Sequence, residues 1–195
     1  MTKMNLVESL LVMSPFRALL ARGEVEALLR WAKLPADATV LDLGCGPGIV
    51  SVRLAREAQP RLVAAFDLDA AMVKRARRRA KGLPVAPLVA DATHMPFANA
   101  LFDAVFVVGV LHHVPDWRAA FPEVARVLKP GGRFCFAEPS RRYLMLVYRL
   151  LPHLRDAMFS ADEWRSALAD ASLQFEGEFH RLPLWDICGV ATKPS

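Results

Sequence analysis

The amino-acid sequence predicts an α/β fold, in which helices cover both faces of a doubly wound, mostly parallel sheet. Short apolar runs alternate with segments of helical pattern between residues 38 and 138. Some of these runs are apolar throughout, as at residues 105–108, which is typical of strands buried on both faces. Alternation and burial together favour a parallel sheet built from strand–helix–strand units. A chain of 195 residues suits one such domain.

Residues 1–35 are expected to form two helices that cover this core. Apolar side chains recur there at helical spacing, as in the pairs at positions 19 and 20 and at positions 28 and 29. Pro15 interrupts the pattern and suits the start of the second helix. Polar residues break the apolar stretch that follows Lys3 before it reaches the length of a signal peptide or a membrane span, so we expect no targeting segment.

The predicted core, residues 38–138, contains five strands in order. They are the runs TVLDLG, RLVAAFD, VAPLVAD, FDAVFVVGVL and GRFCFAE, and helical stretches are expected between them. Residues 140–172 then predict a helical insertion, which begins with an apolar stretch and ends with a helix over residues 162–171. Residues 173–195 predict two closing strands, with Pro183 between them. No repeat or low-complexity stretch separates these parts, so we interpret the chain as a single domain.

Positive charge is concentrated in one predicted helix. The chain carries a formal net charge of +5 with a pI of about 9.4, and six basic residues lie between positions 74 and 81. Apolar residues in the same stretch suffice to dock the helix, and the stretch holds no aromatic side chain that could stack on a base. We therefore interpret it as a solvated helix face and expect no nucleic-acid partner.

The cysteines favour a reducing compartment. Cys45, Cys135 and Cys188 are odd in number and widely separated, which suits neither a disulfide framework nor a CxxC metal site. We expect a cytoplasmic protein in which these thiols are inert.

A glycine-rich turn follows the first predicted strand. The residues Gly44, Cys45, Gly46, Pro47 and Gly48 lead directly into a helix, and glycines of this kind let a ligand approach the main chain at the start of a helix. A dinucleotide fingerprint would need its third glycine at position 49, which is an isoleucine. The spacing disfavours a pyrophosphate ligand, and a purely structural turn remains an alternative.

Carboxylates end the next two predicted strands. Asp67 lies nineteen residues beyond Gly48, where a carboxylate would accept hydrogen bonds from both hydroxyls of a ribose. Asp69 is expected to cap the helix that follows. Asp91 closes the third strand, where it would either border an adenine or cap a helix, and both interpretations stay open.

The motifs in this order resemble those of the class I S-adenosylmethionine-dependent methyltransferases, in particular the small enzymes of ubiquinone and menaquinone biosynthesis. The similar segments are VLDLGCGPG, AAFDLDAAMVKRAR, VADATHMPFANALFDAVFVVGVLHHVPDW and EVARVLKPGGRF, which together lie within residues 38–138. The resemblance implies a Rossmann-like, seven-stranded sheet whose last strand is antiparallel. It also implies that S-adenosylmethionine, and its product S-adenosylhomocysteine, bind over the carboxyl ends of the strands.

The resemblance further implies a role for each residue of this cofactor site. The glycine turn would line the methionine part with Asp42 as support, and Asp67 would hold the ribose with two apolar residues packed beside it. The next two residues in the chain would border the adenine, and the last two would close the site. The residues implied are Asp42, Gly44, Cys45, Gly46, Gly48, Asp67, Leu68, Met72, Asp91, Ala92, Gly109 and Val110.

The candidate catalytic residues follow the fourth and fifth strands. Methyl transfer from a sulfonium mainly requires that the acceptor is held in line, so a base is not obligatory. His112 and His113 stand where a base would lie, and on an extended segment only one of them could face a substrate. A structural or cofactor-covering role for both is the alternative. Glu138 would either orient a substrate or cap a helix, and no third group completes a metal site with the histidines.

The expected methyl acceptor is a small hydrophobic molecule such as a quinone or lipid, rather than a protein or nucleic acid. Residues 143–151 offer more apolar surface than one sheet-packing stripe requires. Nearby arginines would suit an anionic membrane surface, which favours peripheral membrane contact at most. Burial against another helix or a second subunit would explain the same apolar pattern. We expect a monomer or homodimer. The rival functions are a noncatalytic S-adenosylmethionine-binding module and an NAD-type oxidoreductase.

Overall fold

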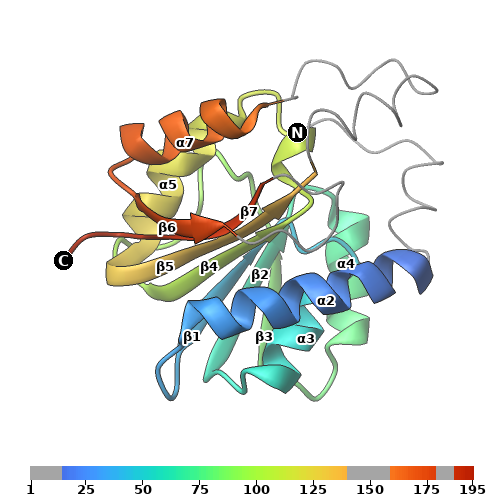
Figure 1. Ribbon diagram of the computed structural model, residues 1–195. Coiled ribbons are helices and arrows are strands. Elements are labelled where there is room, and N and C mark those ends of the chain that lie inside the picture. The colour runs from blue at the N-terminus through green and yellow to red at the C-terminus, as the bar shows by residue number, and fades with distance from the viewer. Residues whose placement is uncertain (1–14, 140–158, 179–186) are drawn as a thin grey trace.

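The computed structural model describes residues 15–139, 159–178 and 187–195, which form a seven-stranded sheet between two layers of helices (Figure 1). The strand order is β3-β2-β1-β4-β5-β7-β6, so the chain reverses direction across the sheet between β1 and β4. Strands β1 to β5 are parallel, and β7 is antiparallel to both of its neighbours. The strands are β1 Thr39–Leu43, β2 Leu62–Asp67, β3 Val85–Val89, β4 Phe102–Val108, β5 Leu128–Glu138, β6 Gln174–Glu178 and β7 Ile187–Thr192.

Successive side chains of the central strands pack into opposite layers, as a sheet buried on both faces requires. Val105 and Val107 of β4 belong to the apolar cluster beneath α5 and α7, whereas Phe106 and Val108 belong to the cluster beneath α2 and α3. The first layer contains α5 Ala120–Val127, α7 Ala161–Asp170 and the 3-10 turns η1 Leu111–His113 and η2 Trp117–Ala119; the second contains α2 Pro15–Ala32, α3 Ile49–Glu57 and α4 Ala70–Arg79.

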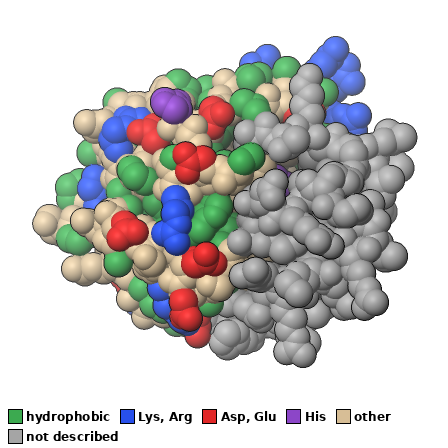
Figure 2. Space-filling model, turned by 90° about the horizontal axis from the view of Figure 1, so that it is seen from above, with side chains coloured by type: hydrophobic (Ala, Val, Ile, Leu, Met, Phe, Trp, Pro, Cys, Tyr) green, Lys and Arg blue, Asp and Glu red, His purple; other side chains and the backbone are tan. Residues whose placement is uncertain are grey.

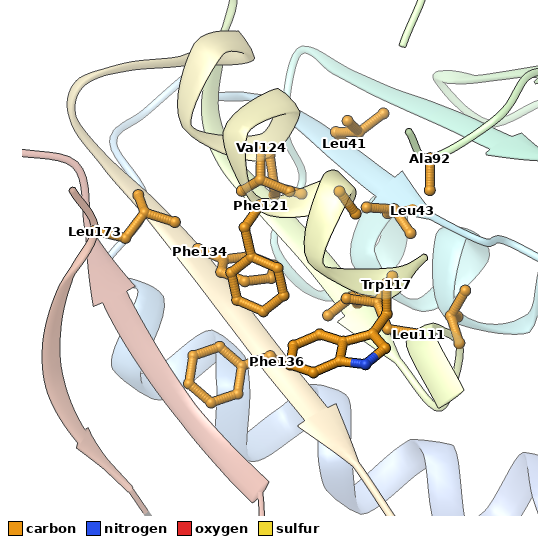
Figure 3. Packing of buried hydrophobic residues seen from close by; sticks show 14 of the residues in the cluster. Leu41, Leu43, Ala92, Leu111, Trp117, Phe121, Val124, Phe134, Phe136 and Leu173 are labelled. Atoms are coloured by element: carbon orange, nitrogen blue, oxygen red, sulfur yellow. The ribbon is translucent and has the colours of Figure 1, made fainter. Parts of the chain in front are cut away.

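Aromatic rings fill the layer beneath α5 and α7. Phe121 and Trp117 point towards Phe134 and Phe136 on β5 (Figure 3). Trp164 of α7 lies at the centre, with ring centroids 4.9 Å from Phe121 and 5.1 Å from Phe136. Pairs of this kind contribute about 0.5–1.5 kcal/mol each beyond the burial of their area. The cluster fixes α7 and the turn after η1 to the sheet.

No helix separates β3 from β4 within residues 90–101, all of which the structure describes, so the expectation of a helix between these strands is wrong. Two side chains of α5 hold this loop instead. Glu123 accepts a hydrogen bond from the backbone N–H of Met95, and Arg126 donates to the carbonyl oxygens of Met95 and Phe97. These bonds satisfy backbone groups that a helix would otherwise satisfy internally.

The other predictions of the fold are confirmed where the structure describes the chain. The doubly wound, Rossmann-like sheet has its last strand antiparallel, α2 begins at Pro15, and α7 overlaps the helix expected over residues 162–171. The first N-terminal helix, the apolar segment 143–151, Pro183 and the arginines at 141, 142, 149 and 155 lie outside the described residues. In the part of the chain that is described, no helix is long and apolar enough to cross a bilayer.

The basic helix α4 uses two of its arginines within the fold. Arg77 donates to the carbonyl oxygen of Pro87 in β3 at 3.2 Å, and Arg79 donates through Nε to the carbonyl oxygen of Pro47 at 3.0 Å. On the coloured part of the surface in Figure 2, acidic, basic and hydrophobic side chains are interspersed. The arginine run thus serves partly to attach α4 to the sheet edge and to the glycine turn.

Candidate functional site

The glycine turn after β1 has a backbone that favours glycine at three positions. Gly44, Gly46 and Gly48 have φ values of +71°, +50° and +82°. A Cβ at Gly44 would stand 2.2 Å from Cγ1 of Val110, and one at Gly48 would stand 2.9 Å from Cα of Ala76. Both positions therefore lack room for a side chain, so Gly44 lies directly against the loop after β4 and Gly48 against α4.

The turn delivers the chain to the amino end of α3. Gly48 is the N-cap residue, and no side chain caps the helix in the described structure. The first N–H groups of a helix have no intrahelical acceptor, and they lie at the positive end of its dipole. An anionic ligand group beside the glycine turn would meet these donors.

Asp67, the last residue of β2, lies across this turn. Its Oδ2 accepts a hydrogen bond from the Gly46 N–H and its Oδ1 accepts one from the Asp69 N–H, both at 2.9 Å. The side chain belongs to a residue that is 7% exposed, and burial raises its pKa above the usual value. Each oxygen of an ionised carboxylate has two acceptor positions, so each retains one for a ligand hydroxyl.

Asp42 supports the turn from below. It is buried at the end of β1 and accepts a hydrogen bond from the Ser51 hydroxyl of α3, which ties the strand to the helix across the turn. Burial raises the pKa of Asp42 to about 7; the Ser51 hydrogen bond opposes that shift and the charge of Asp67 adds to it. Sequence reasoning missed Ser51, because its apolar neighbours give no sign that it faces a carboxylate.

Asp91 lies just beyond β3 and caps a turn. Its Oδ1 accepts hydrogen bonds from the backbone N–H and the hydroxyl of Thr93, each at 2.9 Å, and these bonds hold its pKa below the usual value. No helix follows in this described loop, so the helix-cap alternative for Asp91 is wrong. Asp69, in contrast, does cap α4 by accepting from the Ala71 N–H, as expected. Ala92 is fully buried beside Asp91.

Two apolar candidates lie near Asp67. Leu68 is partly exposed directly after β2, whereas Met72 is buried in the first turn of α4. Arg79 at the other end of α4 holds Pro47 of the glycine turn, a contact that the sequence did not predict because the whole basic run looked solvated. Helix α4 is thus attached to the site at its amino end through its cap Asp69 and near its carboxyl end through Arg79.

Glu138 organises the loop after β4 from the end of β5. It has no solvent exposure, and its Oε1 accepts hydrogen bonds from the N–H groups of Val110 at 2.7 Å and Leu111 at 2.9 Å. Its Oε2 lies 2.8 Å from Nδ1 of His112. Gly109, with φ +67°, precedes this segment and donates its N–H to the Ala137 carbonyl oxygen at 2.8 Å. The helix that the alternative would have Glu138 cap falls among residues 140–158, outside the described residues.

The two histidines occupy a 3-10 turn, so the expectation of an extended segment with rings on opposite sides is wrong. The ring centroids of His112 and His113 are 4.0 Å apart with planes at 43°. Burial and the neighbouring His112 hold the pKa of His113 well below its usual value. The rings thus lie together, and of the two only His112 has a carboxylate partner among the described residues.

The three cysteines are buried free thiols. Burial raises the pKa of both Cys45 and Cys135, and Asp42 and Asp67 add to the shift at Cys45. A thiolate is therefore strongly disfavoured at either position. Among the described residues, no group of three or more histidine, cysteine, aspartate or glutamate side chains is placed to hold a metal ion.

The strand order brings the sequence-predicted residues to one edge of the sheet. The glycine turn, Asp67, Asp91, the Gly109–Val110 segment and Glu138 follow or end the five parallel strands at their carboxyl ends. Ligands of open α/β sheets bind at this edge, beside the point where the strand order reverses. Here that point lies between β1 and β4, where Gly44 meets Val110.

The chain is similar to known methyltransferases in sequence and in structure. The methyltransferase domain family matches residues 41–136. A fatty-acid O-methyltransferase from Mycolicibacterium smegmatis is 35% identical over 69% of this chain and 43% of its own length, and a demethylmenaquinone methyltransferase from Corynebacterium glutamicum is 36% identical over 68% and 58%. The chain thus spans about half the length of the curated relatives it matches.

A solved structure agrees with these relatives. The geranyl diphosphate C-methyltransferase from Streptomyces coelicolor A3(2), crystallised with Mg²⁺, geranyl diphosphate and S-adenosyl-L-homocysteine, is 25% identical, with a TM-score of 0.72 over 82% of this chain and 64% of that one. Taken with the sheet topology and the residues at its carboxyl edge, these similarities show that the chain belongs to the class I S-adenosylmethionine-dependent methyltransferases.

Proposed function

We propose that this chain transfers a methyl group from S-adenosylmethionine to a small, hydrophobic acceptor by in-line displacement. The observation that carries the proposal is the position of Asp67, whose two oxygens are held by the N–H groups of Gly46 and Asp69 beside the glycine turn. A carboxylate fixed in this way retains acceptors for the two hydroxyls of one ribose.

The residues at the carboxyl edge fit the parts of this cofactor. Asp67 would hold the ribose, and the glycine turn with the amino end of α3 would hold the methionine part. Leu68 and Met72 would pack beside the ribose, and Asp91 with Ala92 would border the adenine. Gly109 with Val110 would close the site. The bound cofactor would supply an electrophilic methyl group on a sulfonium sulfur.

The protein's own contribution is positioning. Holding an acceptor in line with a reactive carbon can lower the barrier by roughly 7–11 kcal/mol. The buried bonds of Asp42 to Ser51 and of Glu138 to the loop after β4 would keep the two sides of the site at a fixed separation. Rigid support of this kind favours a catalyst whose main task is to align two ligands.

The hydrophobic acceptor is supported by relatives that act on hydrophobic molecules. Their names specify a fatty acid, demethylmenaquinone and geranyl diphosphate. The apolar segment 143–151, whose composition suits either a substrate cover or a buried interface, would contribute to the cover in this proposal. A small-molecule acceptor, peripheral contact with an anionic membrane and a cytoplasmic location form one consistent proposal, with either a monomer or a homodimer.

Two experiments test the proposal. Calorimetry should show that S-adenosylhomocysteine binds more tightly than NAD, and tighter binding of NAD would favour the oxidoreductase instead. Tritium from methyl-labelled S-adenosylmethionine should then appear in a lipid extract rather than in water-soluble metabolites. The transfer assay is carried out both with and without anionic vesicles. Binding of S-adenosylhomocysteine without transfer to either fraction would identify a noncatalytic module.

A further inference from the structure

Glu138 makes more hydrogen bonds than are needed to hold the loop after β4 against the end of β5. A fully buried carboxylate accepts from two backbone N–H groups through Oε1 and meets the His112 ring through Oε2. An uncharged amide oxygen could accept from the same two N–H groups without the cost of burying a charge. A carboxylate at this position therefore indicates that Glu138 has a function besides holding the loop after β4.

That task concerns the His112 ring. The Glu138 oxygen lies 2.8 Å from Nδ1, and an ionised carboxylate only accepts hydrogen bonds, so an ionised Glu138 would favour the tautomer that carries its hydrogen on Nδ1. The lone pair is then on Nε2, and the structure gives the His112 ring no second hydrogen bond among the described residues. A carboxylate that fixes a histidine in one tautomer and orientation is an established device for preparing a base.

We propose that His112 is the proton acceptor of the methyl-transfer reaction and that Glu138 is the positioning residue that prepares it. The inference rests on the proposed methyltransferase function and extends it to acceptors whose attacking group carries a proton, such as a hydroxyl. Glu138 links this base to the cofactor turn, because the Val110 N–H it binds belongs to the residue that packs against Gly44.

His113 is not assigned this role. It lies beside His112, but no carboxylate in the described part of the chain orients it, and its burial with a neighbouring imidazole disfavours a second positive charge. It would serve instead as a neutral ring that covers one side of His112. In this proposal His112 is the base and His113 shields one side of its ring.

The attacking oxygen of the acceptor forms a bond to the methyl carbon while the carbon–sulfur bond breaks, and that electron pair stays on sulfur, which becomes an uncharged thioether. His112 Nε2 takes the proton that the acceptor's hydroxyl loses. Glu138 then faces an imidazolium whose positive charge it balances, and the proton leaves to solvent after the product departs.

The variant Glu138→Gln separates the effect of Glu138 on the His112 tautomer from its hydrogen bonds to the loop after β4. The two backbone donors oblige the amide oxygen to take the place of Oε1, so the amide NH₂ must face His112. Nδ1 then has to accept, and the hydrogen moves to Nε2, where a lone pair is needed for catalysis. The loop keeps both of its hydrogen bonds, and only the tautomer changes.

Nitrogen-15 NMR of the imidazole rings tests this directly and needs no methyl acceptor. We expect the His112 signals, assigned by their loss in His112→Gln, to report hydrogen on Nδ1 in the native chain and on Nε2 in Glu138→Gln. Calorimetry with S-adenosylhomocysteine should give an affinity within about threefold of the native chain. With the lipid extract as acceptor, the rate at saturating cofactor should fall by about 100-fold or more in both variants, as for loss of a general base.

Asp103→Asn is the matched control. Asp103 is also a carboxylate that accepts a backbone N–H, from Thr39, and it contacts Lys129, but it lies at the amino end of β4, across the sheet from the site. This variant should keep the native rate within about twofold. Hydrogen on Nε2 in the native chain, or full activity in Glu138→Gln, would overturn the proposal. Failure of S-adenosylhomocysteine to bind the native chain would instead contradict the proposed function and leave the NMR result standing.

Discussion

Asp42 precedes the last residue of β1 and Asp67 ends the adjacent strand β2, but their partners give the two carboxylates different roles. Asp42 is enclosed and bound to the Ser51 hydroxyl, so its effect should appear in stability. Asp67 is held by two backbone N–H groups and has acceptors to spare, so its effect should appear in binding. Hydrogen-bond capacity, rather than residue type, thus distinguishes the two carboxylates.

Replacing Asp67 should abolish tight cofactor binding. Asp67→Ala removes two charge-assisted hydrogen bonds to the ribose, each contributing about 1.5–3 kcal/mol, so the affinity for S-adenosylhomocysteine should fall by about 100-fold or more. Calorimetry measures the loss. Asp69→Ala is the control in the same loop, because it removes only the cap of α4 and should change the affinity by less than about threefold. Native affinity in Asp67→Ala would place the ribose elsewhere.

The raised pKa of Asp42 should make the protein less stable as pH rises. Its pKa is about 3.8 in the unfolded chain and about 7 in the folded protein, so between these values folding retains a proton that the unfolded chain has lost. Stability therefore falls through this window by up to about 1.4 kcal/mol per pH unit and levels off above it.

Asp42→Asn checks this slope, because asparagine can still accept from Ser51 but does not titrate. Urea denaturation from about pH 5 to about pH 8 should show the variant gaining stability relative to the native chain as pH rises. Parallel pH profiles for the two proteins would contradict the assignment.

Among the elements, those with a strong periodic pattern were predictable and those held by side chains were not. The apolar runs identified β1, β2, β4 and β5, and the spacing around Pro15 identified α2. The helix expected after β3 is absent because Glu123 and Arg126 satisfy the backbone of that loop from α5. Such bonds join residues far apart in sequence, and no local sequence pattern predicts them.

The same distinction applies to the site. The glycine turn and Asp67 could be located from sequence because their spacing relative to the strands reflects the backbone alone. The pairing of His112 with Glu138 could not, since it depends on β4 and β5 being neighbours in register. The 3-10 turn that places both rings together is likewise imposed by the hydrogen bonds to Glu138 rather than by local propensity.

Arg126 should be a major stabilising residue of the loop after β3. Its guanidinium bonds to Glu123, to Asn99 and to two carbonyl oxygens of the loop. Arg126→Met should lower the free energy of unfolding by about 2 kcal/mol, because several partly buried acceptors lose one charged donor at once. Urea denaturation measures this. Arg118→Met, which removes a cation over the Trp117 ring and an exposed ion pair, should cost about 1 kcal/mol or less. Equal losses would show that the loop does not depend on Arg126.

At the scale of the whole molecule, the site joins two halves of the sheet. The glycine turn and Asp67 come from the half formed by β1, β2 and β3, whereas Val110, His112 and Glu138 come from the half that begins with β4. A ligand that contacts both halves binds the folded chain and not the unfolded one. Binding should therefore stabilise the entire domain.

Thermal unfolding should report this coupling. At a concentration about 100 times its Kd, S-adenosylhomocysteine should add about 2.7 kcal/mol of stability, which for a domain of this size corresponds to a rise in Tm of about 5–10 °C. Differential scanning calorimetry measures the shift, and NAD at the same concentration is the control. An unchanged Tm at a concentration that saturates binding would mean that the ligand binds the folded domain no more tightly than the unfolded chain.

The strand order also determines which strand of the nascent chain stays unpaired during synthesis. β1, β2 and β3 come from one continuous stretch and can pair as soon as they emerge, but the partner on the other side of β1 is β4, which emerges only after β3 and the loop that follows it. Until then the future centre of the sheet is an open edge, with unpaired main-chain groups and apolar side chains on both faces. The nascent chain is most vulnerable to aggregation in this interval, and β1 is the segment that a ribosome-associated chaperone would have to shield.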